Sequence, residues 1–177
     1  MNGLGVPLFA ACLSILLSVG TAARANELLI NGDASKTTHL PLLVSFANSG
    51  GTEAQSLYTA EQLTDIGPGG SIDSVTFYPQ YNRCDTIGAT YTIRLFEVPE
   101  PSIAGSMADT TGGTIVYEGP LPYCDWEMHV TFSTPYIYQG GHLVIDCFVS
   151  TPSSRGINFV SFYGIQKTGA DNFEAQS

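Results

Sequence analysis

Paired glycines divide the chain into short segments, at residues 50–51, 69–70, 112–113 and 140–141. A stretch of alternating or β-branched residues begins within a few positions of each pair. Glycine adopts the backbone angles of tight turns at little steric cost, and stretches of this kind bounded by turns are typical of β-strands. No long stretch has helical periodicity, and the helical candidate is about one turn at residues 59–63. The pattern therefore predicts an all-β chain.

The expected strands alternate between apolar and polar positions. In the strand expected at residues 126–133, Trp126 is in phase with the apolar Met128, Val130 and Phe132. A large aromatic side chain in phase with apolar neighbours is usually buried, so we expect Trp126 in the core rather than on a sugar-stacking surface. Strands are expected at residues 39–46, 54–58, 71–79, 89–98, 114–118, 126–133, 142–149 and 156–163.

Strands with one apolar and one polar face fit antiparallel sheets that pack against each other. We therefore predict a single antiparallel β-sandwich domain. A break in the alternation over residues 72–77 predicts a bulge near Ser74. The expected core consists of Val75, Phe77, Tyr91, Ile93, Leu95, Trp126, Met128, Val130, Phe132, Leu143 and Ile145.

The first 25 residues have the pattern of a secretory signal peptide. An apolar run at residues 7–20 is shorter than the roughly 20 residues of a membrane-spanning helix, and Ala23 and Ala25 follow it at small-residue positions. The alternative is a lipoprotein acylated at Cys12, but the apolar run continues past that cysteine. We expect cleavage after Ala25, a β-sandwich domain at residues 26–166, a polar tail at 167–177 that is frayed or truncated, and a secreted or cell-surface location.

The acidic character of the chain excludes some classes of binding partner. Sixteen acidic residues stand against six Lys and Arg, which gives a net charge of −10. Binding to phosphates requires clustered Lys and Arg, and here these residues are scattered singly. We therefore expect no nucleic-acid partner and no insertion into a membrane after signal cleavage.

The cysteines divide into two kinds. Cys147 shares the apolar face of its expected strand with Leu143 and Ile145, so we expect a buried, unreactive thiol. Cys84 and Cys124 lie in similar polar contexts at the borders between loops and strands, and a disulfide between them is our prediction. The alternative is that both are free thiols, because sequence does not fix the Cα separation that a bridge requires.

Signatures of catalysis and metal binding are absent from the sequence, which contains no HExxH, GxSxG, CxxC, GxGxxG or Walker motif. Close carboxylates occur at Asp125 with Glu127 and at Glu97 with Glu100, but a glycosidase needs its two carboxyls facing each other across a cleft. The three histidines, His39, His129 and His142, lack metal-ligand spacing. Possible calcium ligands at residues 31–33 and 171–172 are explained more simply by turns. We expect no catalytic residue, metal or cofactor.

Seven phrases of the sequence occur in a characteristic order, at residues 30–33, 39–42, 55–61, 70–78, 114–119, 126–132 and 135–145. Over about residues 28–149 this series resembles a β-sandwich module of exported bacterial surface proteins, similar to the adhesin domains attached to gingipain-type proteases. The resemblance implies an antiparallel jelly-roll-like β-sandwich. It also implies adhesion or ligand binding rather than catalysis.

These observations predict a non-catalytic extracellular binding or adhesion module. Its ligand would be a glycan or a host or matrix protein, bound by loops at one end of the sandwich. The alternatives are a secreted hydrolase, cleaving glycan or peptide with a carboxylate pair, and a structural spacer without ligand. The expected ligand-binding residues, held side by side by the Cys84 to Cys124 bridge, are Tyr81, Asn82, Arg83, Tyr123 and Asp125. Tyr136 and Tyr138 are further surface candidates.

Overall fold

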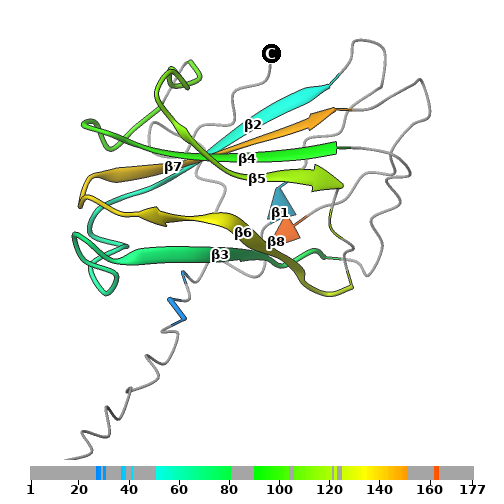
Figure 1. Ribbon diagram of the computed structural model, residues 1–177, viewed down its shortest axis with the longest axis horizontal. Helices are drawn as coiled ribbons and strands as arrows, with labels where there is room; N and C mark the ends of the chain where they lie inside the picture. The colour runs from blue at the N-terminus through cyan, green and yellow to red at the C-terminus, as the bar shows by residue number, and fades with distance from the viewer. Residues whose placement is uncertain are drawn as a thin grey trace, which may run out of the picture.

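Antiparallel β-strands are the regular elements of the described chain (Figure 1). The computed structural model describes residues 27–28, 30, 37–38, 41, 51–80, 90–103, 106–120, 122, 125–150 and 162–163. Its strands are β1 (Thr37–Thr38), β2 (Thr52–Tyr58), β3 (Ser71–Phe77), β4 (Thr90–Val98), β5 (Thr114–Pro120), β6 (Met128–Ile137), β7 (His142–Ser150) and β8 (Phe162–Tyr163). The strands expected at residues 54–58, 71–79, 89–98, 114–118, 126–133 and 142–149 are confirmed with small shifts of their ends. The strand expected at 39–46 lies almost wholly outside the described residues, and of 156–163 only β8 is described.

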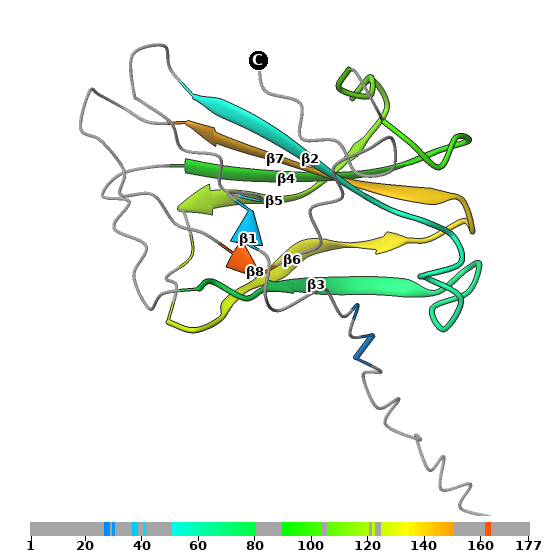
Figure 2. The ribbon, with the colours of Figure 1, turned by 180° about the vertical axis from the view of Figure 1, so that it is seen from behind.

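The strands form two layers. A four-stranded sheet in the order β2-β7-β4-β5 makes one layer, and β3 paired with β6 makes the other. Figures 1 and 2, which view the molecule from opposite sides, both show the two layers facing each other. The short β1–β8 pair adjoins the second layer, because Pro79 bridges to Phe162 and the Tyr163 N–H donates to the Tyr78 carbonyl at 2.8 Å. The arrangement is all-β, antiparallel and compatible with a β-sandwich.

Local irregularities follow the sequence closely. The register of β3 against β6 shifts between Ile72 and Ser74, which confirms the predicted bulge. The expected helical turn near residues 59–63 is a series of hydrogen-bonded turns. Thr59 and Gln62 stabilise its start reciprocally: the Thr59 N–H donates to Gln62 Oε1 at 2.8 Å, and the Gln62 N–H donates to Thr59 Oγ1 at 3.4 Å. This is the capping-box arrangement, and here it closes a turn instead of a helix.

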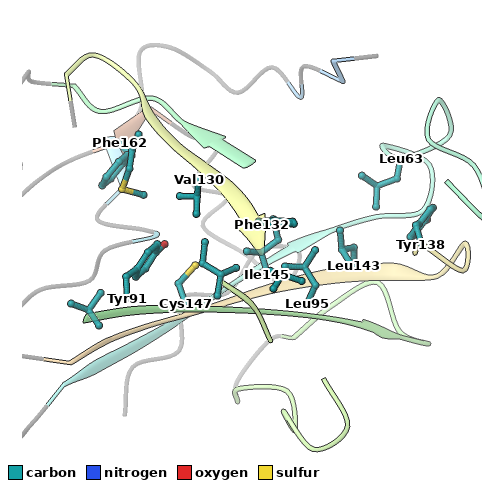
Figure 3. Packing of buried hydrophobic residues seen from close by; sticks show 14 residues of the cluster. Leu63, Tyr91, Leu95, Val130, Phe132, Tyr138, Leu143, Ile145, Cys147 and Phe162 are labelled. Carbon is teal, nitrogen blue, oxygen red and sulfur yellow. The ribbon is translucent and has the colours of Figure 1, made fainter. Parts of the chain in front are cut away.

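The core lies between the layers. Figure 3 shows Val130 and Phe132 of β6 facing Leu95, Ile145 and Cys147 of the four-stranded sheet. Ten of the eleven predicted core residues are buried or, for Val75 and Phe77, partly buried and packed against the buried cluster. The cluster also contains Cys147, whose predicted burial is confirmed, and residues that the pattern had not placed there, namely Leu63, Val116, Tyr138 and Phe162.

A second apolar cluster covers the outer face of the four-stranded sheet. The segment from Pro99 to Gly113, described except for residues 104–105, folds back over this face. Ile103 of that segment packs with Leu57, Phe96 and Val144. The outer face of the four-stranded sheet, which the sequence pattern presented as half polar, is therefore partly covered by a loop. Both faces of this sheet bury apolar side chains.

Candidate binding surface

Of the residues predicted to form the ligand surface, the structure describes one, Asp125. Asp125 is exposed and lies in the connection from β5 to β6. The other residues expected there, including both cysteines of the predicted bridge, lie outside the described residues: Tyr81, Asn82, Arg83, Cys84, Tyr123 and Cys124. The predicted signal peptide at 1–25 with Cys12, and the tail at 167–177, lie outside them as well. These assignments stay predictions.

Trp126 is on the surface, and its predicted burial is wrong. Its side chain is 63% exposed, the largest exposure among the described large apolar residues. The alternation fails because β6 begins at Met128, and the chain before it turns at Trp126 instead of continuing as a strand. The Asp125 N–H donates to the Glu127 carbonyl at 3.2 Å, which brings the residues flanking Trp126 together.

The backbone of Trp126 has a left-handed conformation. Its φ is 62°, and it is the one non-glycine residue with positive φ in the described part of the chain. This conformation is a genuine outlier for a bulky residue. Such strain costs about 1 to 3 kcal/mol and is found preferentially at binding and catalytic sites. Strain and exposure therefore coincide at one aromatic side chain.

Acidic residues flank Trp126 in the chain, and an aromatic residue, Tyr78, lies at the same end of the sheet. The register that pairs Phe77 with Met128 places the end of β3 beside the start of β6, at the same end of the sheet. Burial, followed by the charges of Glu27 and Glu127, raises the pKa of Tyr78. We refer to Tyr78, Asp125, Trp126 and Glu127 as the Trp126 surface.

Hydroxyl and imidazole groups continue this surface along the outer face of β3 and β6. His129 is exposed, as predicted from its polar position in the alternation. Its Nδ1 lies 2.8 Å from Thr76 Oγ1 and its Nε2 lies 3.2 Å from Thr131 Oγ1. The two contacts fix the ring between neighbouring strands, so groups able to donate and accept hydrogen bonds extend away from Trp126.

Glu97, one of the carboxylates weighed for catalysis, holds a turn together. Its Oε2 accepts the Gly141 N–H at 2.6 Å, and its Oε1 accepts the Gln139 N–H at 2.7 Å and the Tyr136 hydroxyl at 3.0 Å. Glu100 is exposed at the start of the next loop. Three hydrogen-bond donors therefore converge on Glu97, and the carboxylate fixes the β6–β7 turn.

The two tyrosines expected on the surface do not present an open ring face to solvent. Tyr138 is 1% exposed, and its hydroxyl donates to the Gly141 carbonyl at 2.6 Å. Tyr136 is half-buried, and burial followed by its hydrogen bond to Glu97 raises its pKa. The expectation for Tyr138 is therefore wrong, because its side chain folds back into the core beneath the turn.

The structure brings together a carboxylate pair that local sequence spacing could not reveal. Asp146 is 1% exposed; its Oδ2 lies 3.0 Å from Arg94 Nη1, and its Oδ1 accepts the Gln55 Nε2–H at 3.1 Å. Burial, followed by the charge of Asp146 and a hydrogen bond with it, raises the pKa of Glu53. The alternation does place Asp146 opposite Cys147, but its partners come from strands about 50 and 90 residues away in the chain.

This network fastens the segment 99–113 to the sheet. The Ala108 N–H donates to Gln55 Oε1 at 2.7 Å, and Gln55 Nε2 donates to the Ala108 carbonyl at 3.1 Å. Asp146 lies at the centre of these contacts with its oxygens already engaged. Buried polar groups here satisfy one another's hydrogen bonds beneath a loop. We refer to Gln55, Arg94, Asp146 and the backbone of Ala108 as the clasp.

No group of three or more His, Cys, Asp or Glu in the described part of the chain is arranged to hold a metal ion. His142 Nδ1 accepts the Ala60 N–H at 3.1 Å. No helix of the described segments is long and apolar enough to cross a membrane.

No family model, curated protein or solved structure matches this chain. The function of the Trp126 surface is therefore inferred from its own residues.

Proposed function

We propose that this protein is a non-catalytic extracellular binding or adhesion module and that the Trp126 surface is its contact site. The observation that supports the proposal most strongly is the exposed, left-handed Trp126. A large aromatic held in water loses the free energy that burial would supply, and its backbone adds strain. Both costs are offset when a ligand covers the ring.

The position of this surface supports the same function. It lies at the end of the sheets where the β5–β6 connection and the end of β3 meet (Figure 1). Binding residues are found preferentially on loops that a rigid scaffold positions. Asp125, predicted from sequence as a contact residue, belongs to the same turn. The resemblance to adhesin modules favours a glycan or protein ligand, and the predicted signal peptide favours a secreted or cell-surface location.

We further infer that the fold is a single jelly-roll domain. The described strands pair β1 with β8, β2 with β7, β3 with β6 and β4 with β5. This is the pairing of one long hairpin of eight strands wrapped into two sheets, the jelly-roll arrangement. The contact of β8 with the end of β3 supports the order β1-β8-β3-β6 for the second sheet. Jelly rolls serve many functions, so the fold favours no particular ligand.

Binding is tested with the secreted protein on a glycan array and in pull-downs with matrix proteins. The proposal expects a positive signal that Trp126→Ala abolishes. Ile137→Ala is the matched control, because Ile137 is 50% exposed at the far end of β6. Silence in both panels would leave a spacer role. Unchanged binding by Trp126→Ala would place the contact elsewhere, with the segment 99–113 as the next candidate.

A secreted hydrolase is the competing proposal, and the pairing of Glu53 with Asp146 is the observation in its favour. Product release from a mixed polysaccharide and casein panel would support it, provided that Glu53→Gln abolished the activity. We favour binding because Asp146 is buried and already hydrogen-bonded to Gln55 and Arg94.

A further inference from the structure

The π face of an exposed tryptophan attracts two kinds of ligand group, sugar rings and cations. Cation–π contacts are strongest with tryptophan and are made more often by Arg than by Lys. The charges near the indole ring decide whether a sugar or a cation is the better ligand. Asp125 and Glu127, which flank Trp126 directly, are both exposed and free to face a ligand.

Tyr78 lies at the same end of the sheet as Trp126, because Phe77 pairs with Met128. Burial is the largest cause that raises the pKa of Tyr78, and the charges of Glu27 before β1 and Glu127 before β6 add to it. Carboxylates from two separate segments therefore act at this end of the sheet.

No described Lys or Arg competes for this surface. Arg94 is the one such residue in the described segments, and it lies on the outer face of the other sheet, paired with Asp146 at 3.0 Å. The whole chain has a net charge of −10, which adds a long-range attraction for cationic partners. A neutral sugar could donate hydrogen bonds to the carboxylates, but it would gain no attraction from the net negative charge.

We propose that the Trp126 surface binds an Arg- or Lys-rich segment of a partner protein, with the cationic side chain over the indole ring and Asp125 and Glu127 beside it. This inference rests on the proposed binding function and names its ligand class. An Arg guanidinium suits the surface best, because its flat face stacks on an aromatic ring while its N–H groups reach carboxylates.

The probe is a short Arg-Gly repeat peptide, and its control is the same peptide with citrulline, the neutral isostere, in place of Arg. Trp126 is the single tryptophan of the chain, so its fluorescence reports binding at the site itself. We expect the Arg peptide to change the emission, to bind more weakly as salt rises, and to bind at least about tenfold more tightly than the citrulline peptide.

The double variant Asp125→Asn with Glu127→Gln keeps the ring and removes its flanking charges. It should bind the Arg peptide about tenfold more weakly, since it loses two exposed ion pairs, each of which contributes modestly. Glu118→Gln, an exposed acid on β5, should bind as the wild type does. Equal binding of the Arg and citrulline peptides, or an unchanged double variant, would overturn the inference.

The two proposals fail in different ways. If the Arg peptide does not bind but a glycan or matrix protein does so in a Trp126-dependent manner, the cationic ligand is wrong and the binding function stands. If the Arg peptide, followed by calorimetry, binds Trp126→Ala as tightly as the wild type, the Trp126 surface is not the binding site and both proposals are wrong about it.

Discussion

The Arg94 guanidinium lies 3.0 Å from the Asp146 carboxylate across the β4–β7 pair, on the sheet face turned away from the main core. Gln55 meets the same carboxylate from β2, and its amide reaches the backbone of Ala108. One buried carboxylate therefore links three strands and the loop that covers them.

Asp146→Ala should destabilise the fold by about 3 kcal/mol, because it leaves Arg94 and Gln55 without their shared partner. Chemical denaturation of the two proteins measures the difference. Glu118→Ala, on the exposed face of β5, is the control and should change stability by less than about 0.5 kcal/mol. Equal stability of the Asp146 variant and the wild type would show that the clasp contributes nothing.

Glu53→Gln should stabilise the protein at neutral pH. Burial and the neighbouring Asp146 raise the pKa of Glu53 above its ordinary value of 4.5. Between the ordinary and the raised value the folded state binds more protons than the unfolded state, so stability falls as pH rises through that window. Glutamine resembles the protonated acid and avoids this loss. The gain in melting temperature should therefore shrink below pH 4.5, and a gain independent of pH would contradict the assignment.

Glu97→Ala should cost about 2 kcal/mol, because the carboxylate accepts three hydrogen bonds that fix the β6–β7 turn. Glu100→Ala, three residues further along the chain and exposed, should be nearly neutral. Thermal unfolding distinguishes the two. Loss of a hydrolytic activity in Glu97→Ala without loss of stability would instead give Glu97 a catalytic role.

Trp126→Gly should be about 1 kcal/mol more stable than Trp126→Ala, because glycine adopts a φ of 62° freely and alanine does not. Both variants remove the side chain, so the comparison isolates the backbone strain. Denaturant midpoints provide the measurement. If alanine were as stable as glycine, the left-handed conformation would carry no strain.

The sequence was sufficient for the strands and for most of the core, because alternation within a strand reflects the local period of two residues. The bulge near Ser74 appeared in the same way, as a break of phase. Trp126 was misplaced because the alternation of β6 was extended two residues beyond its first residue, Met128, across a left-handed turn.

The clasp and the Trp126 surface depend on register between strands that are distant in the chain. Gln55 and Asp146 face each other only because β2 and β7 pair in one particular register. The same holds for Tyr78, which follows β3, and Glu127, which precedes β6: the pairing of Phe77 with Met128 brings both positions to one end of the sheet. Periodicity within one segment contains no information about either contact.

A measurement of how far the Trp126 indole is exposed to solvent tests the proposed binding surface most directly. Because the chain has one tryptophan, quenching of its fluorescence by acrylamide reports on that side chain alone. We expect emission of the folded protein to be that of a solvated indole and quenching to approach that of the urea-unfolded chain. Emission typical of a buried indole, with strong quenching only after unfolding, would return Trp126 to the core and contradict the proposed site.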